Sequence, residues 1–371
     1  MAVPDCIFVW QNLLLLQPDS NIDSMKKTHL IITAAIAAIA GTIIILILAQ
    51  KTSKTVRTDI PNSIYYWNTR FRIDKNEAQF LKRNDIRRMY VRFFDVDLNR
   101  EDYFHDTCAP VADIEFYRKN LDLVDSLKVE IVPVVFITPA AIRHYRSFTD
   151  NLAHRIHAMC RRYSISISEV QFDCDWTAST RDDFFQFLKE VRPSLEGYFQ
   201  KKIRISSTIR LHQLAQTPPE ADYGVLMCYN TGNFKDFNTK NSILDVKDVK
   251  PYLKYLKKYR LPLAIALPTY EWYVEFDGNQ KFVKLDSYFS RLKDTLEYRK
   301  IGENLYEKLD ALAFPEGSTR YVRHDQVPAE TIIATKQLIQ KKYGKTAIVL
   351  FNLEYYQLRK YTEDEIKAFF D

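Results

Sequence analysis

Short apolar runs alternate with amphipathic segments along the chain from residue 62 to its end. A continuous apolar run is typical of a strand buried on both faces of a parallel sheet, and an amphipathic segment is typical of a helix that covers such a sheet. The pattern predicts strands at residues 63–67, 88–95, 130–137, 170–175, 204–209, 224–229, 263–267 and 346–351. It predicts helices at residues 74–83, 113–127, 150–163, 181–192, 248–259, 328–342 and 362–370.

Eight strands with intervening helices predict a (β/α)8 TIM barrel, an α/β fold that usually takes about 250 residues. The fifth connection, near residues 211–215, is short. Residues 270–325 are too many for a simple crossover and predict an α+β insertion after the seventh strand, with a helix near residues 286–298. A doubly wound open sheet is the alternative fold, but the sequence has no glycine-rich phosphate loop to support it.

An uncharged, mostly apolar stretch at residues 29–49 follows Lys26 and Lys27. Its length suffices for a transmembrane helix that crosses a bilayer. We expect an uncleaved signal anchor rather than a cleaved signal peptide, because the stretch is longer than a typical signal core and the bulky Ile47 stands near the expected cleavage site. Met25 resembles the start of a bacterial export signal, so residues 1–24 are expected to be a non-native extension.

These features divide the chain into four parts, an extension at residues 1–24, an anchor or signal peptide at 25–50, a linker at 51–61 and the barrel at 62–371. The membrane is therefore an expected partner through residues 29–49. We expect the barrel to lie outside the cytoplasm of a bacterium, either held at the membrane by the anchor or exported after cleavage.

The 53 basic and 47 acidic residues leave a net charge of +6 and form no long basic block with interleaved aromatic residues. This distribution argues against a nucleic-acid partner. The five cysteines include no Cys-x-x-Cys pair, so neither zinc nor a disulfide framework is expected. Asp95 and Asp97 could ligate a divalent cation together with the acids of the fourth strand. No histidine or further acid cluster supports such a site, and we expect no metal or other cofactor.

Two carboxylates, Asp173 and Asp175, end the fourth predicted strand. Residues two apart in a strand point to the same face, so these acids share one face and residues 172, 174 and 176 take the other. Burial of an unpaired carboxylate is unfavourable, and a close pair of carboxylates raises the pKa of at least one of them. The pair therefore indicates a binding or catalytic site.

Aromatic and polar side chains end the other predicted strands, at the rim where the active sites of such barrels lie. Aromatic faces stack on sugar rings, and carboxylates and amides bond to sugar hydroxyls. The rim predicts a carbohydrate partner, with these substrate-binding candidates: Trp67, Asp95, Trp176, Tyr229, Asn230, Trp272 and Glu354. Arg92 and Arg210 also lie near strand ends, where an arginine would lower the pKa of a neighbouring carboxyl such as Asp173.

The sequences Phe-Asp-Cys-Asp-Trp at residues 172–176 and Met-Cys-Tyr-Asn at residues 227–230 resemble the chitinase-type family 18 glycoside hydrolases. The fourth strand of that family carries Asp-x-x-Asp-x-Asp-x-Glu. The resemblance implies that Asp173 and Asp175 correspond to the second and third acids, and that Tyr229 corresponds to the tyrosine that contacts the reacting acetamido group. Val170 and Thr177 occupy the positions of the first acid and of the final glutamate, which donates the proton in that family.

Threonine cannot act as a general acid near neutral pH, so a proton donor must come from another strand. Asp173 and Asp175 stand about 6.6 Å apart along one strand rather than on the two sides of a scissile bond. Glu271 is the first candidate, because apolar neighbours would raise its pKa, and Glu354 and Asp95 follow. We therefore expect a glycoside hydrolase with Asp173, Asp175 and Glu271 as catalytic residues. The alternative is a non-catalytic carbohydrate-binding or cell-envelope protein on a degenerate barrel.

Overall fold

The structure is a computed structural model that describes residues 60–99, 107–288, 292, 294–309 and 318–371. The chain from Val56 to Asp371 forms one compact unit. The predicted extension at residues 1–24 and the apolar stretch at residues 29–49 lie outside the described residues. In the part of the chain that the structure does describe, no helix has the length and apolar character needed to cross a bilayer.

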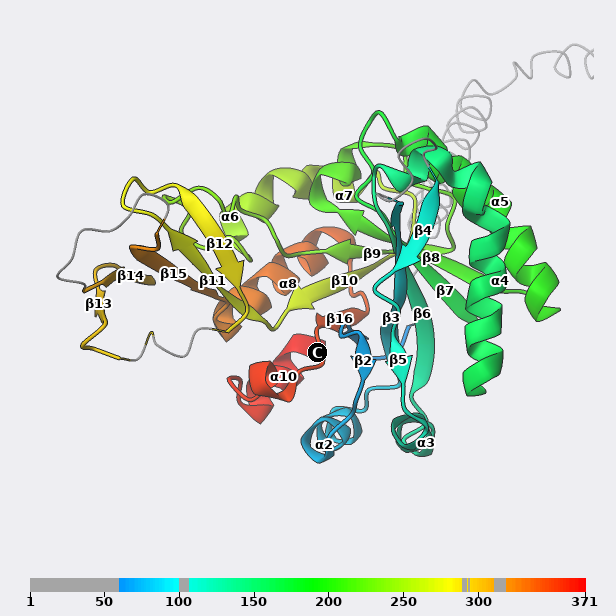
Figure 1. Ribbon diagram of the computed structural model, residues 1–371, viewed down its shortest axis with the longest axis horizontal. Helices are drawn as coiled ribbons and strands as arrows, with labels where there is room; N and C mark the ends of the chain where they lie inside the picture. Colours follow the sequence, from blue (N-terminus) through cyan, green and yellow to red (C-terminus); the bar gives the residue numbers. More distant parts are fainter. Residues whose placement is uncertain (1–59, 100–106, 289–291, 293, 310–317) are drawn as a thin grey trace, which may run out of the picture. The chain divides into compact units, whose positions relative to one another are not determined.

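Eight parallel strands close into a barrel, which confirms the predicted TIM-barrel fold (Figure 1). The first strand closes it by pairing with the second and the last, so that Ser63 lies opposite both Arg88 and Val349. In barrel order the strands are β1 (Ser63–Tyr66), β3 (Arg88–Leu98), β6 (Glu130–Ile137), β7 (Glu169–Asp173), β8 (Arg204–Arg210), β9 (Tyr223–Met227), β10 (Leu263–Pro268) and β16 (Ile348–Phe351). An antiparallel strand, β4 (Cys108–Val111), extends the sheet beside β3, and β2 (Arg70–Phe71) pairs with β5 (Glu115–Phe116).

Helices cover the outside of the barrel, and α4 and α5 lie side by side there (Figure 1). The α-helices are α2 (Lys75–Arg83), α3 (Arg118–Ser126), α4 (Tyr145–Tyr163), α5 (Arg181–Phe199), α6 (Val246–Val249), α7 (Leu253–Leu256), α8 (Ala329–Tyr343), α9 (Tyr355–Leu358) and α10 (Glu363–Phe370). Short 3-10 helices are η1 (Ala141–His144), η2 (Leu211–Ala215) and η3 (Lys250–Tyr252). The single helix predicted at residues 248–259 is divided into three, because Pro251 in η3 has no N–H to continue the α-helical bonding.

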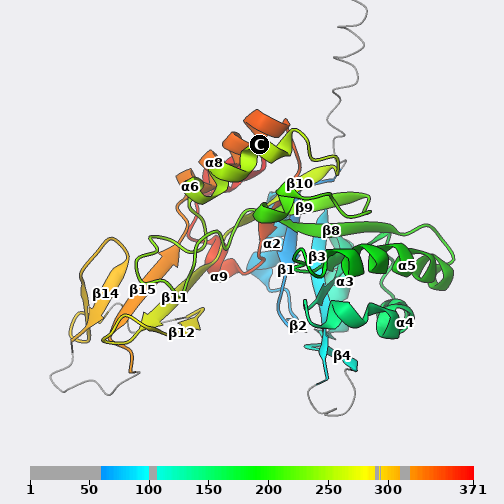
Figure 2. The same cartoon turned by 90° about the horizontal axis from the view of Figure 1, so that it is seen from above.

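The insertion after β10 is an antiparallel sheet of five strands, four of which are labelled together in Figure 2. Its strands are β11 (Glu271–Phe276), β12 (Phe282–Asp286), β13 (Tyr298–Lys300), β14 (Leu305–Lys308) and β15 (Tyr321–Gln326), in the order β12-β11-β15-β14-β13. Tyr273, Tyr298 and Val322 form a small core of its own. The helix expected near residues 286–298 is wrong for the described residues there, which end β12, form turns and begin β13.

Polar side chains from alternate positions of β7 line the barrel interior in successive layers. At the N-terminal end of the strand, the fully buried Glu169 pairs with Arg88 at 3.1 Å between carboxylate and guanidinium. In the next layer, Gln171 accepts a hydrogen bond of 2.6 Å from the hydroxyl of Tyr65. Asp173 supplies the third layer. The strand thus carries satisfied polar groups through the core and ends in acids at its C-terminal end.

Candidate functional site

The mouth of the barrel consists of the residues that end or follow the C-terminal ends of the eight strands. Strand alternation places the side chains of β7 there as predicted, with Asp173 on the interior face and Phe172 and Cys174 fully buried on the outer face. Trp176 is also fully buried, and its ring packs edge-on against Phe185 of α5 with 5.4 Å between ring centres. The prediction that Trp176 binds substrate is wrong, because its ring has no surface that a ligand could contact.

Asp173 lies at the floor of the mouth and is only 3% exposed. Its Oδ1 accepts a hydrogen bond of 2.5 Å from Thr208 Oγ1 and lies 3.8 Å from Nη2 of Arg210. Burial raises the pKa of Asp173, although the charge of Arg210 lowers it and the nearby Asp175 raises it further. The net direction is opposite to the one expected from a neighbouring arginine, because burial outweighs this long ion pair.

Asp175 lies closer to solvent, and its side chain is 47% exposed. Its Oδ1 accepts a hydrogen bond from Nε of Arg210, whose side chain is 21% exposed. Together the two groups offer carboxylate acceptors and guanidinium donors to the hydroxyl groups of a ligand. The floor of the mouth therefore presents a charged pair suited to hydrogen bonding.

A row of partly exposed aromatic rings crosses the mouth from β1 to the insertion. The ring centre of Trp67 lies 5.7 Å from that of Phe351, which lies 5.6 Å from Tyr270, and Tyr270 lies 5.5 Å from Trp272. Tyr229 is 6% exposed and packs against Phe351 with 5.0 Å between ring centres. The planes of neighbouring rings are inclined at 52° to 73° to one another, and aromatic rings are the side chains on which sugar rings stack.

Asp95 is tied to this aromatic row through an arginine. Its Oδ1 accepts a hydrogen bond of 2.7 Å from Nε of Arg92, and the guanidinium carbon of Arg92 lies 5.6 Å from the ring centre of Trp67. Asp95 also adds to the raised pKa of Asp173, after the larger effects of burial and the nearer charges. It therefore belongs to the charged floor of the mouth and is paired with a protein cation.

Asn230 and Glu354 lie at the rim of the mouth. Asn230 is exposed, has a left-handed backbone with φ of 54°, and accepts a hydrogen bond of 2.6 Å from the hydroxyl of Tyr270. Glu354 is half-buried, and its Oε1 accepts a hydrogen bond of 3.3 Å from Nδ2 of Asn352. Both side chains retain acceptor capacity for a ligand.

Glu271 begins β11 and contacts two basic side chains. Its Oε2 lies 3.0 Å from Nε2 of His324 and 2.9 Å from Nζ of Lys360. Burial alone would raise the pKa of Glu271, but the hydrogen bonds and charges of His324 and Lys360 outweigh burial and lower the pKa to about 2. The predicted increase in this pKa is wrong, and a carboxyl that stays ionised at neutral pH does not favour Glu271 as a proton donor.

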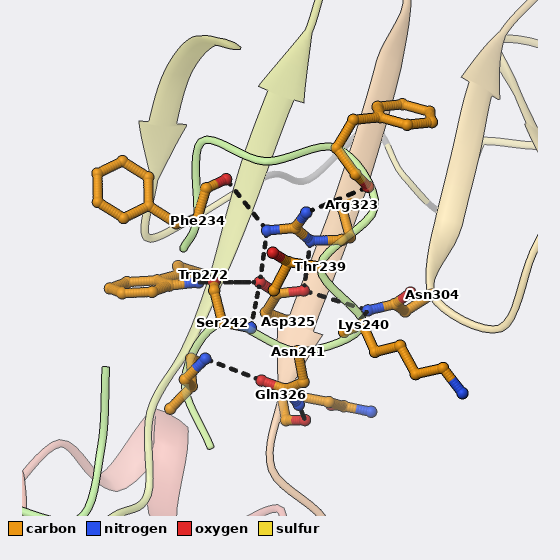
Figure 3. A network of polar contacts seen from close by, with 12 residues as sticks. Phe234, Thr239, Lys240, Asn241, Ser242, Trp272, Asn304, Arg323, Asp325 and Gln326 are labelled. Carbon is orange, nitrogen blue, oxygen red and sulfur yellow. Dashed lines mark hydrogen bonds and ion pairs between the residues drawn. The ribbon is translucent and has the colours of Figure 1, made fainter. Parts of the chain in front are cut away.

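A buried polar network fixes the orientation of Trp272 (Figure 3). The indole Nε1 donates to Oγ of Ser242 at 3.0 Å and to Oδ2 of Asp325 at 3.3 Å. Asp325 is fully buried and pairs with Arg323, whose Nε lies 2.9 Å from its Oδ1. The guanidinium of Arg323 also donates to the main-chain oxygen of Asp236 at 2.7 Å. The network joins the insertion sheet to the loop after β9, so the last ring of the aromatic row has a fixed position.

Thr177, at the position of the proton donor in the sequence resemblance, is exposed. Its N–H donates to Oγ1 of Thr180 at 3.0 Å, and its hydroxyl lies 3.0 Å from Oγ of Ser179. These bonds shape the turn that leads into α5. Both partners are hydroxyl side chains, so these bonds do not connect Thr177 to a carboxylate or a histidine.

Two further features of the described residues bear on the choice of site. No group of three or more histidine, cysteine, aspartate or glutamate side chains among them is placed to hold a metal ion. A cavity of about 530 Å³ lies away from the mouth, between β4 and α4, where Phe94, Leu152 and Arg155 are among the lining residues and no described carboxylate is. Aromatic faces and hydrogen-bonding groups converge at the mouth instead, which makes the mouth the stronger candidate.

Three contributors to the site were not singled out from the sequence. Phe351 ends the eighth apolar run, and this position at a strand end could have indicated that it lies at the mouth. Thr208 is two residues before Arg210, so it shares a face with it, which alternation could have indicated. The pairing of Arg323 with Asp325 has the same spacing, but nothing in the sequence shows that both side chains are buried.

Comparisons with known proteins were made on sequence and on structure. No protein-family profile matches the sequence, and no curated protein matches it. Among solved structures, the spore cortex-lytic enzyme SleL of Bacillus cereus is 15% identical with a TM-score of 0.52, over 85% of this chain and 75% of that chain. A chitinase from Chromobacterium violaceum is 10% identical with a TM-score of 0.52, over 82% of this chain and 97% of that chain. An immunomodulatory active chitinase from Trichuris suis is 11% identical with a TM-score of 0.50, over 84% and 99%.

Identities this low establish likeness of fold and leave the activity to be argued from the site. The likeness extends over more than four fifths of the chain. The resemblance expected from the sequence is therefore confirmed at the level of the fold, which is a divergent chitinase-like (β/α)8 barrel.

Proposed function

We propose that the barrel binds a glycan at its mouth and does not hydrolyse it. One observation carries this proposal. The aromatic row and the Arg210–Asp175 pair open onto the same mouth, whereas Thr177, which cannot donate a proton, takes the place of the acid. Binding groups are thus present and the means of the usual cleavage is missing.

Each part of the mouth has a definite role in this proposal. The rings of Trp67, Phe351 and Tyr270 stack on successive sugar rings. Arg210 and Asp175 bond to hydroxyl or acetamido groups at the floor. The chitinases that share this fold support an N-acetylated hexosamine polymer as the ligand class. Because the mouth lies on an extracytoplasmic domain in this proposal, the ligand is a cell-envelope or host glycan.

Hydrolysis by Glu271 is less favoured by the geometry. A general acid must be protonated when the bond breaks, and a pKa of about 2 leaves Glu271 ionised at neutral pH. The basic side chains that lower this pKa are His324 of β15 and Lys360 after α9, so Glu271 joins the insertion to the C-terminal segment. Asp173 has a raised pKa, but it is 3% exposed and bonded to Thr208.

The Trp67→Ala variant tests the proposed binding. We expect the dissociation constant for chito-oligosaccharides, measured by titration calorimetry, to increase by about tenfold or more, because the variant loses one face of the aromatic row. The Trp67→Phe variant keeps a flat ring and serves as the matched control, with a smaller expected increase. Unchanged affinity in the alanine variant, with an unchanged melting temperature, would contradict the proposal.

We also propose that residues 29–49 anchor the chain in the membrane, with the barrel outside the cytoplasm. The support is the uncharged apolar stretch that follows two lysines. Sequencing of the native N-terminus in the membrane fraction checks this. A chain that retains residues 29–49 agrees with the anchor, and a chain that begins after residue 49 shows a cleaved signal peptide instead.

A further inference from the structure

The base of the barrel, opposite the mouth, consists of the C-terminal ends of the outer helices and the loops that lead into the strands. Four consecutive basic pairs lie there, Arg161–Arg162 at the end of α4, Lys201–Lys202 after α5, Lys257–Lys258 after α7 and Lys341–Lys342 at the end of α8. All eight side chains are exposed. They precede β7, β8, β10 and β16, which lie on one side of the barrel with β9 between β8 and β10.

These positive charges are not neutralised by neighbouring acids. Among the described residues, none of the eight takes part in an ion pair. Two exposed acids in the loop before β9, Glu220 and Asp222, pair instead with Lys189 and Arg192, at 3.2 Å and 3.1 Å. The base thus carries eight exposed cationic side chains, and no ion pair is recorded for them among the described residues.

Helix stability alone does not account for this distribution. A cation near a helix C-terminus interacts favourably with the helix dipole, which accounts for the pairs in the last turns of α4 and α8. Lys201–Lys202 and Lys257–Lys258 lie beyond the ends of their helices, where the dipole effect falls off. The helix dipole therefore does not explain all of the exposed basic pairs at the base.

The chain also enters the barrel at this end. Because the strands are parallel, Ser63 at the start of β1 lies at the base. The proposed anchor ends at Ala49, and an extended chain from Ala49 to Ile60 spans at most about 40 Å. The base is therefore the end of the barrel at which the chain from the proposed anchor enters.

We propose that the base is a docking surface for anionic phospholipid headgroups, which holds the barrel on the membrane with its mouth facing away. A basic surface beside a membrane segment attracts anionic lipid, and the attraction acts within about one Debye length, about 8 Å at physiological salt. Docking adds a second membrane contact to the anchor. It orients the mouth toward glycans beyond the membrane, and it does not depend on whether the mouth binds or cleaves them.

Vesicle cosedimentation of residues 56–371 tests this surface without the anchor, since these residues form a compact unit that contains the whole barrel. We expect binding to phosphatidylglycerol vesicles at low salt, loss of binding at high salt, and no binding to phosphatidylcholine vesicles. Reversal of two pairs to glutamate, Lys201–Lys202 and Lys257–Lys258, is expected to weaken binding by about tenfold or more. Circular dichroism and the melting temperature verify that the variant is folded.

A control variant carries the same change in net charge away from the base. It replaces four exposed lysines of the mouth-side loop and the insertion by glutamate, Lys240, Lys247, Lys281 and Lys300. We expect this variant to retain most of the vesicle binding. Equal loss of binding in both variants would show that only net charge matters and would overturn the proposal. Equal binding to phosphatidylcholine, or tighter binding to double-stranded DNA through the same pairs, would overturn it as well.

Discussion

Replacement of Arg323 by methionine is expected to destabilise the domain by about 3 to 5 kcal/mol. The guanidinium is 1% exposed and neutralises Asp325, which is fully buried. Methionine fills much of the volume but leaves the carboxylate buried without its cation, and this is the costly way to break a buried ion pair. The variant also removes the donors to the main-chain oxygens of Phe234 and Asp236 in the loop after β9. Urea unfolding of residues 56–371 measures the change.

The insertion provides a matched control in Arg299. This side chain is 63% exposed and pairs with Glu307 at 2.7 Å. An exposed pair contributes between about 0 and 1 kcal/mol, so Arg299→Met should shift the unfolding midpoint only slightly. Similar midpoints for the two methionine variants would contradict the structural role given to Arg323. Because Asp325 also accepts from Trp272, the Arg323 variant should change tryptophan fluorescence before global unfolding.

The Glu271→Gln variant is expected to lose about 2 to 3 kcal/mol of stability at neutral pH. The pKa of Glu271 is lowered from its ordinary value near 4.5 to about 2 by His324 and Lys360, after their effect has overcome that of burial. Each unit of such a shift corresponds to about 1.4 kcal/mol. Burial lowers the pKa of Lys360 despite its ion pair with Glu271. This unfavourable burial of Lys360 offsets part of the stability that the ion pair contributes. Glutamine keeps the shape of the side chain and removes its charge.

The direction of the pKa shift of Glu271 determines how the stability difference between the two chains changes with pH. A carboxyl whose pKa is lowered on folding contributes its full stability above the unfolded pKa and loses it as the pH falls through the folded pKa. The difference between the natural chain and the Glu271→Gln variant should therefore be constant above about pH 5 and shrink between about pH 4.5 and pH 2. Glu354→Gln is the control, because the amide oxygen of glutamine can still accept the hydrogen bond from Nδ2 of Asn352, and the expected change is below about 1.5 kcal/mol. A difference for Glu271 that grows as the pH falls would contradict the assignment.

Local patterns were sufficient to predict the barrel and the position of the acids. Apolar runs identified all eight barrel strands, because a strand buried on both faces has few polar positions. Strand alternation correctly separated Asp173 from Phe172 and Cys174. The same alternation placed Trp176 on the outer face. The prediction that Trp176 contacts sugar rested only on its position at a strand end. Burial under α5 excludes that contact.

Contacts between distant segments could not be predicted in this way. Glu271 has apolar sequence neighbours, and burial raises its pKa, but His324 and Lys360, which lie 53 and 89 positions later in the chain, lower the pKa by more. The pair of Arg210 with Asp175 depends on the register of β7 against β8, in which Phe172 lies opposite Ser207. The insertion was expected to include a helix near residues 286–298, but the described residues there include the end of β12, which pairs with β11, and the start of β13, which pairs with β14.

The most direct test of the proposed function compares binding with turnover on the same sample. Residues 56–371 are incubated with chito-oligosaccharides and cell-wall glycans, and both retention of glycan and new reducing ends are measured. We predict saturable binding that Trp67→Ala weakens, with no release of reducing ends above the buffer control. Release of reducing ends by the natural chain that is abolished in a folded Glu271→Gln or Asp175→Ala variant would contradict the proposal and establish a glycoside hydrolase.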